Sequence, residues 1–268
     1  MSTMTTNKFR EMLASGKPTL GTRILTTKPY VTEIVGASGN FDYIEFVAEY
    51  SAMSQEDMEN ICRAAELHGM ASMIKIDFQN RGFIAQKAAA SGFQAIMFTD
   101  HKTPDEVRES VWLMKSDSPE GKGRFGYPNR RWIGYKPAIP QMEHAKRADD
   151  TVLVFMIEKK DAIDNIDEIC SIDGVDMVQF GPSDYAMSLG WNTAEHPEEI
   201  YKAHCRMIEA ALKHGVRPRV ELYGAPDEAE KWIALGVKDF CFGDECMVYT
   251  NFVNKSGYAM REIVNAIK

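Results

Sequence analysis

The sequence predicts an α/β protein with a closed (β/α)8 barrel, built as a single domain over residues 1–268. Apolar runs of strand length alternate with segments of helical period, and eight such runs follow one another. The length of 268 residues suits one barrel of typical size, although it also fits two average domains. A doubly wound open sheet is the alternative fold, because periodicity alone does not distinguish it from a closed barrel.

The first half of the chain carries clear helix signals between its strands. Ser54 is placed to cap a helix that has Glu56 and Asp57 in its first turn. Pro104 stands in the first turn of a later helix, a position that proline favours. The expected strands cover residues 19–25, 43–48, 72–76 and 95–99, and the expected helices cover 7–14, 30–36, 54–68, 82–91 and 104–114.

The second half begins with a long interruption at residues 116–150, which are rich in Pro, Gly, aromatic and basic residues. We expect a functional loop there, because connections of that length are rarely plain linkers. An apolar stripe of helical period then joins two strands into a parallel βαβ unit. The expected strands cover 152–157, 177–180, 219–223 and 240–243; the stripe is Ala162, Ile163, Ile166 and Ile169; further helices cover 197–214, 227–235 and 256–267.

Composition and charge narrow the functional classes. A net charge of -8 and a pI near 5.4 argue against a nucleic-acid surface, while an anionic small molecule needs only a local positive site. No apolar run approaches membrane length, and the N-terminus lacks the apolar core of a signal peptide. Five cysteines without CxxC spacing indicate reduced thiols. We therefore expect a cytoplasmic protein with no nucleic-acid or membrane partner.

Two carboxylates mark the ends of neighbouring strands. Glu158 follows the apolar run 152–157, and Asp184 lies in the turn after the run 177–180. Because adjacent parallel strands lie about 4.8 Å apart, acids just past their C-terminal ends can converge. Two carboxylates, with the other positions left to water and substrate, are a common way to hold Mg²⁺ or Mn²⁺. The alternative is purely structural, with Glu158 capping the next helix and Asp184 serving the turn.

Further polar side chains follow the other strands, where a barrel gathers its chemistry. Lys75 could hold a carboxylate or a developing enolate, and His101 could move protons near neutral pH. The structural alternative is that Glu49 or a neighbouring acid neutralises Lys75 and that His101 only begins the next helix. The strand-end residues as a group are Glu45, Glu49, Lys75, Asp77, Asp100, His101, Glu158, Asp184, Glu221, Tyr223, Asp244 and Glu245.

These residues carry a resemblance to the HpcH/HpaI family of metal-dependent aldolases, a branch of the phosphoenolpyruvate/pyruvate TIM barrels. The matching segments are GTRIL, FDYIEFVAEYS, MIKIDFQN, SGFQAIMFTD and ALGVKDFCFGDE. The most specific match is IE followed by GVD and GPSD with SLG, where the family has IET and GPxDLSxxxG. The pattern spans roughly residue 20 to the C-terminus.

The resemblance implies a reversible aldol reaction on a 2-oxo acid such as pyruvate. It implies Glu158 and Asp184 as ligands of Mg²⁺, Mn²⁺ or Co²⁺, which stabilises the enolate as a Lewis acid. It assigns the substrate carboxylate to backbone amides at Gly181, Ser183 and Asp184, and it makes Glu49 an acid behind the metal site. It also implies a hexamer, in which a C-terminal helix packs on a neighbouring subunit.

The chain departs from the family where proton transfer is expected. The catalytic His of the family is Tyr50 here and its acid partner is Ala90, so the proton-transfer dyad is absent. Val47 replaces an Asp, Lys75 replaces the Arg that holds the reacting oxygen, and Met156 replaces a Gln. The leading hypothesis is a metal-dependent C–C lyase in which His101, with Asp100, replaces the dyad. The alternatives are hydrolysis, decarboxylation, isomerisation or condensation through a similar enolate, or a non-catalytic barrel.

Overall fold

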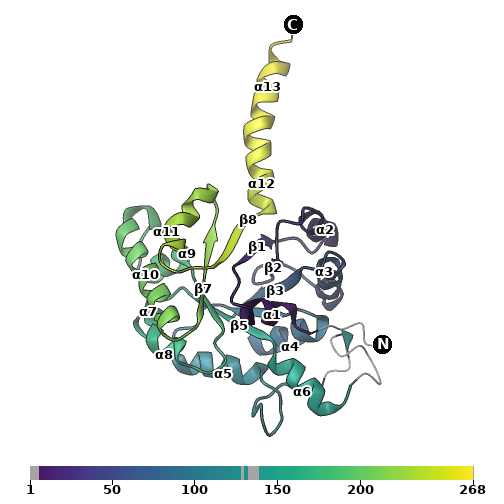
Figure 1. The fold of residues 1–268 in the computed structure, drawn as a ribbon. Helices are drawn as coiled ribbons and strands as arrows, with labels where there is room; N and C mark the ends of the chain where they lie inside the picture. Colours follow the sequence, from purple (N-terminus) through teal and green to yellow (C-terminus); the bar gives the residue numbers. More distant parts are fainter. Residues whose placement is uncertain (1–5, 128–129, 132–138, 268) are drawn as a thin grey trace.

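The computed structural model describes residues 6–127, 130–131 and 139–267, and within them eight parallel strands close a barrel (Figure 1). The strands neighbour one another in chain order, and β8 pairs with β1 to close the ring. The strands are β1 (Thr19–Ile24), β2 (Tyr43–Val47), β3 (Ala71–Ile76), β4 (Ala95–Phe98), β5 (Val152–Ile157), β6 (Met177–Phe180), β7 (Arg217–Leu222) and β8 (Asp239–Asp244). The predicted (β/α)8 barrel is confirmed, and the open-sheet alternative is wrong.

Helices cover the outside of the barrel, as the alternating periods predict. Ser54 accepts a hydrogen bond from the Asp57 amide and completes a capping box at the start of α3. The helices are α1 (Lys8–Ala14), α2 (Pro29–Ala37), α3 (Gln55–Leu67), α4 (Arg81–Ser91), α5 (Pro104–Met114), α6 (Gln141–Asp149), α7 (Lys160–Asp164), α8 (Ile166–Cys170), α9 (Pro182–Ser188), α10 (Pro197–Lys213), α11 (Ala229–Ile233), α12 (Glu245–Phe252) and α13 (Tyr258–Asn265). Shorter turns are η2 (Thr193–Glu195), η3 (Pro226–Glu228) and the π-helical η4 (Val253–Gly257).

Three segments differ from the sequence prediction. The expected loop 116–150 ends in helix α6, while its residues 128–129 and 132–138 lie outside the described part of the chain. A helix, α9, follows Gly181 where we expected a turn, because Pro182 at its first position starts it. The C-terminal helix begins at Glu245 and not at 256, because Asp244 caps it by accepting from the Met247 amide.

The N-terminal end of the barrel is closed by α1. Phe9 is fully buried and packs against the inward-facing apolar side chains of the strands, with its ring centroid 4.7 Å from that of Tyr43. Asn7 donates to the carbonyl oxygens of Gln94 and Asp150, and Arg10 forms a salt bridge with Asp176. Helix α1 is therefore tied to strands on one side of the ring, and the other end of the barrel is left for chemistry.

A buried ion pair lies inside the barrel. Arg219 on β7 is fully buried, and its guanidinium is 2.5 Å from Oε2 of Glu45 on β2. Arg219 Nε also donates to the Tyr43 hydroxyl at 2.7 Å. Gly21 makes room for this arrangement, since a Cβ there would lie 2.3 Å from the Tyr43 ring. Because each charge is the partner of the other in a dry environment, neither can be removed alone without large cost.

The C-terminal helices form a rod that projects away from the barrel (Figure 1). Side chains along it are exposed, including Tyr249, Phe252, Tyr258 and Ile263, each at least 61% accessible. Apolar side chains of this size are usually covered in a folded protein. Within the described residues, no helix combines the length and apolarity that crossing a membrane requires.

We predict that Arg219→Met lowers the free energy of unfolding by about 3–5 kcal/mol, because it leaves the Glu45 carboxylate buried without its cation. Urea denaturation followed by circular dichroism measures the change. Adding Glu45→Gln should restore part of the loss. The control is Arg108→Met, which removes a surface pair with Glu168 and should change stability little. Equal effects of the two arginine substitutions would show that the buried pair contributes no more to stability than a surface pair.

Candidate active site

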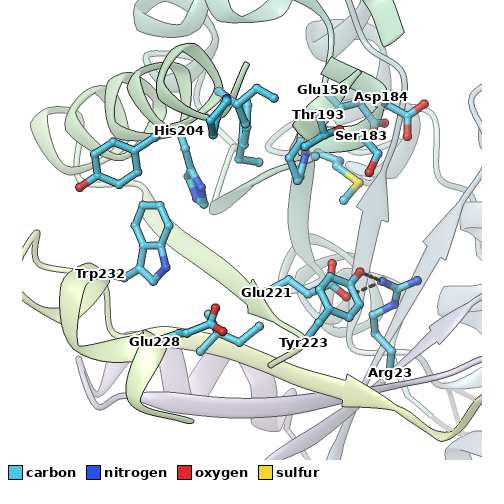
Figure 2. A pocket seen from close by; sticks show the side chains of 18 of the residues that line it. Arg23, Glu158, Ser183, Asp184, Thr193, His204, Glu221, Tyr223, Glu228 and Trp232 are labelled. Atoms are coloured by element: carbon cyan, nitrogen blue, oxygen red, sulfur yellow. Dashed lines mark hydrogen bonds and ion pairs between the residues drawn. The ribbon is translucent and has the colours of Figure 1, made fainter. Parts of the chain in front are cut away.

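A cavity of about 500 Å³ opens at the C-terminal ends of the strands (Figure 2). Charged side chains line the part over the barrel, and aromatic side chains line the part that reaches α10 and α11. Its wall includes Arg23, Tyr50, Lys75, Met156, Glu158, Gly181, Ser183, Asp184, Thr193, His204, Glu221, Tyr223, Glu228 and Trp232. This is the end of a (β/α)8 barrel where active sites are found.

Glu158 is a buried carboxylate at the end of β5. Its side chain accepts a hydrogen bond from the Asp100 amide through Oε1, at 2.8 Å. Burial raises the pKa of Glu158 to about 7, although Lys75 and the Asp100 amide act in the opposite direction. Its second oxygen faces Gly181, where a Cβ would lie 2.8 Å from Oε2. Gly181 therefore keeps the space beside this oxygen open.

Asp184 lies in the first turn of α9, on the wall of the same cavity. The amides of Ser183 and Asp184 belong to this turn, where amide groups lack an acceptor inside the helix. The Gly181 amide is different, because it donates to the Ile157 carbonyl oxygen at 3.0 Å. The sequence prediction of three amide donors is therefore reduced to two, and Gly181 contributes space instead.

Asp100 and Lys159 complete a charged group around these two acids. The Lys159 ammonium is 2.6 Å from Asp100 Oδ1 and 3.5 Å from Asp184 Oδ1. Asp100 has a left-handed backbone with φ 61°, which directs its amide to Glu158. Lys159 thus pairs with Asp100 and Asp184, while Lys75 pairs with Glu49 and acts on Glu158. Four carboxylates face two ammonium groups, and a divalent cation would balance the excess negative charge. With the open oxygen of Glu158, this donor set fits a hard divalent cation.

Lys75 and Glu49 form an ion pair at the ends of β3 and β2, with Nζ and Oε2 2.6 Å apart. Burial acts to lower the pKa of Lys75, but Glu49, Glu158 and Glu45 raise it further, so Lys75 carries its charge. Lys75 lines the cavity, and Glu49 holds it from behind. The structure thus brings together Lys75, Glu49, Glu158 and Asp184 as the sequence predicts.

A second polar group lines the opposite wall (Figure 2). Arg23 on β1 forms a salt bridge with Glu221 and donates to the Tyr223 hydroxyl. The Glu221 side chain is also held by Gln179, whose Nε2 is 3.2 Å away. Sequence reasoning identified Glu221 and Tyr223 as strand-end residues but missed Arg23. The two-residue period of a strand, which puts Arg23 on the same inward face as Gly21, is the signal that could have found it.

His101 does not face the cavity, and its predicted acid/base role is not supported. The ring is 1% exposed and packs edge-on against Phe78, Phe98 and Phe155. Both nitrogens are engaged, Nδ1 with the Thr99 carbonyl at 2.8 Å and Nε2 with Ser110 Oγ at 2.6 Å. Burial lowers the pKa of His101 to about 4, so the ring is neutral near pH 7. The left-handed turn at Asp100 directs the chain out of the barrel before His101.

The positions where the resemblance predicts a proton-transfer dyad, Tyr50 and Ala90, hold no base. Tyr50 is 80% exposed at the cavity, and partial burial of its hydroxyl together with Glu49 raises its pKa, so it keeps its proton. Ala90 is buried in α4 and faces a separate groove beside Phe83. Val47 is buried in β2, and Met156 lines the cavity as an apolar contact.

Comparison with known proteins agrees with this geometry. A sequence profile described as HpcH/HpaI aldolase/citrate lyase matches residues 29–251. The chain belongs to this family. Aldolases and citrate lyases of the family are metal-dependent C–C lyases that act on 2-oxo acids, and the membership indicates an enzyme of the aldolase or lyase type.

Individual relatives cover nearly the whole chain. A 2-keto-3-deoxy-L-rhamnonate aldolase from Escherichia coli and one from Shigella sonnei are each 27% identical over 260 residues, which is 95% of this chain and 93% of theirs. Among solved structures, an HpcH/HpaI aldolase from Desulfitobacterium hafniense has a TM-score of 0.83 at 22% identity, covering 94% of this chain and 96% of its own. Citrate synthase SbnG has a TM-score of 0.83 at 21% identity, covering 97% and 99%.

We predict that His101→Gln removes a pH dependence of stability without stopping turnover. Because the pKa of His101 falls from 6.5 to about 4 on folding, the unfolded chain binds the proton more readily between these values. The wild type should therefore lose about 3 kcal/mol of stability as pH falls from 6.5 to 4, and the variant should lose less. Denaturation at several pH values measures this. A variant whose stability keeps the wild-type pH dependence and whose catalytic rate is a hundredfold lower would indicate that His101 takes part in catalysis.

Proposed function

We propose that this protein is a divalent-cation-dependent C–C lyase of the aldolase type, acting on a 2-oxo acid through an enolate. The observation that supports this most strongly is the pairing of Glu158 with Asp184 beside the charged Lys75 in one cavity. A cation site next to a fixed positive charge suits a reaction in which negative charge develops on oxygen.

Glu158 and Asp184 would hold the cation, with Mg²⁺, Mn²⁺ or Co²⁺ as candidates. The open oxygen of Glu158 and the partly exposed carboxylate of Asp184 are the available donors. When bound, the cation would supply Lewis-acid stabilisation of the enolate. Asp100 orients Glu158 through its amide and holds Lys159 near the site.

The remaining residues of the site would bind and orient the acid. The amides of Ser183 and Asp184 would donate to its carboxylate, while Gly181 provides the space beside them. Lys75 would stabilise negative charge on the reacting oxygen, and Glu49 keeps the ammonium in place. Tyr50 keeps its proton and would serve as a hydrogen-bond donor at the mouth.

A second candidate keeps the cation and the enolate but changes the reaction to hydrolysis, decarboxylation, isomerisation or condensation. The replacement of the family dyad by Tyr50 and Ala90 favours it, since neither residue supplies a base near neutral pH. Product analysis separates the two, because aldol cleavage alone releases an aldehyde or ketone together with the smaller 2-oxo acid.

We predict that the purified, metal-stripped protein exchanges the methyl protons of pyruvate in D₂O only after Mg²⁺, Mn²⁺ or Co²⁺ is added. Asp184→Ala should abolish both the exchange and the binding of Mn²⁺, because it removes a carboxylate of the site. Proton NMR and isothermal titration calorimetry give the two readouts. The matched control is Asp161→Ala, an exposed acid on α7 outside the cavity. Full exchange by Asp184→Ala in the presence of chelator would contradict the proposal.

We propose in addition that the protein works as a homo-oligomer in the cytoplasm, a hexamer by resemblance to its family. The exposed apolar side chains of α12 and α13 support a contact with a neighbouring subunit. The five cysteines are free thiols, which suits a reducing compartment.

Replacing Ile263 with Asp should break this contact, because it puts a charge into an apolar helix surface. We predict a smaller particle for the variant than for the wild type in light scattering coupled to size-exclusion chromatography. Asn254→Asp adds the same charge at an exposed residue of the rod that is already polar, and it should leave the mass unchanged. A wild-type monomer would refute the assembly.

A further inference from the structure

One part of the cavity has a wall of aromatic and aliphatic side chains, apart from Glu158 and Asp184 (Figure 2). We call it the aromatic lobe; its members are Phe180, Ile200, Tyr201, His204, Leu222 and Trp232. They come from the end of β6, the first turns of α10, the end of β7, and α11. The lobe is therefore built by the layer of helices around the barrel and not by the strand ends alone.

The rings of the lobe support one another in a fixed arrangement. His204 stacks on Phe180 with centroids 4.9 Å apart and lies 4.1 Å from the Trp232 ring, which in turn contacts Tyr201 at 5.5 Å. Trp232 is 6% exposed, so packing holds it in place. Such a wall offers flat apolar surface that needs no reorganisation when a ligand binds.

The deep side of the lobe carries no charge near neutral pH. Burial lowers the pKa of His204 to about 3, with Lys231 adding to the effect, so the imidazole is neutral. The charged side chains Glu228 and Lys231 belong to exposed residues at the edge. Across the cavity, by contrast, Arg23 and Glu221 form the polar wall. The site is thus divided into a charged half and an apolar half, within a volume that exceeds the need of a three-carbon acid.

We propose that the aromatic lobe binds the distal substituent of the substrate and that this substituent is aromatic or branched aliphatic. The inference rests on the proposed function and names its substrate class, a 4-hydroxy-2-oxo acid with an apolar group on C4. Phe180, Ile200 and Leu222 offer no hydrogen-bond partner to a hydroxyl group, so a polyhydroxylated chain would leave hydroxyls unpaired against them, which is costly in a buried site. His204 Nε2, which is buried without a hydrogen-bond partner, and the Tyr201 hydroxyl could each pair with a single polar atom of the substituent.

The reaction on such a substrate is balanced without an added reagent. The C3–C4 bond breaks, the C4 hydroxyl loses its proton and becomes the carbonyl of the aldehyde, and the electron pair stays with C3 as the enolate. C3 then takes up one proton, so the products are pyruvate and an apolar aldehyde. The charged half of the cavity would hold the pyruvate part and the aromatic lobe the aldehyde part.

Calorimetry with two uncleavable acids tests the lobe directly. 2-Oxo-4-phenylbutanoate and 2-oxobutanoate share the 2-oxo acid end, lack a C4 hydroxyl, and differ by a phenyl group. We expect the full-length, Mg²⁺-loaded protein to bind the phenyl compound at least about tenfold more tightly, since each added methylene in an apolar pocket is worth that order. Trp232→Ala and the milder Tyr201→Ser, whose side chain is 43% exposed, should reduce this ratio toward one without changing the affinity for 2-oxobutanoate.

The matched control is Trp112→Ala, which also replaces a tryptophan by alanine. Trp112 is a partly exposed residue of α5 and lines a different groove. It should keep the wild-type ratio. Equal affinities of the wild type for the two acids would overturn the lobe and leave the proposed function standing. Failure to bind either acid, together with no exchange of pyruvate protons, would overturn both. Far-UV circular dichroism and thermal melting show whether each variant is folded, and Tyr201→Ser decides the matter if Trp232→Ala is not.

Discussion

The arrangement of the site depends on keeping the Glu158 carboxylate in a buried position. A buried carboxylate without compensation takes up a proton, and the raised pKa of Glu158 shows that Lys75 and the Asp100 amide compensate only in part. The two groups come from β3 and from the end of β4, the strands that precede β5 in the ring. Barrel closure therefore fixes both partners of this acid before any ligand arrives.

Deeper inside the barrel, buried polar side chains are also neutralised or hydrogen-bonded by their neighbours. Arg219 neutralises Glu45 and holds Gln179, and Gln179 reaches Glu221 under the cavity wall. Glu221 in turn positions Arg23. A chain of side-chain contacts thus runs from the centre of the barrel to its mouth. Because each member is buried or partly buried, the orientation of Arg23 depends on residues that no substrate touches.

Much of the fold was predictable from local pattern. A few consecutive residues are enough to recognise each of several features: the eight apolar runs, the capping residue Ser54, and the acids Glu158 and Asp184. The rule that parallel strand ends meet at one edge then places Glu158, Asp184 and Lys75 together. Helix α9 and the early start of α12 were missed because a single proline or cap decided them.

The failures share a physical reason, which is that they depend on backbone direction or on distant elements. His101 follows Asp100 in sequence, but the left-handed φ of Asp100 turns the chain away from the cavity. The aromatic lobe joins residues from β6, α10, β7 and α11, and no local window contains that contact. The sequence shows Tyr50 and Ala90 where the resemblance predicts a proton-transfer dyad, but it could not show that Ala90 faces another groove.

The left-handed backbone of Asp100 lowers the stability of the fold, whereas its side chain contributes to the charge arrangement of the candidate site. A residue with a Cβ is disfavoured there by about 1 kcal/mol or more, and glycine would relieve that cost. Yet the side chain of Asp100 is what holds Lys159 beside Asp184. A search for thermostable variants that scores backbone geometry alone would therefore select glycine at position 100, and it would gain heat resistance at the expense of the charge arrangement around Glu158.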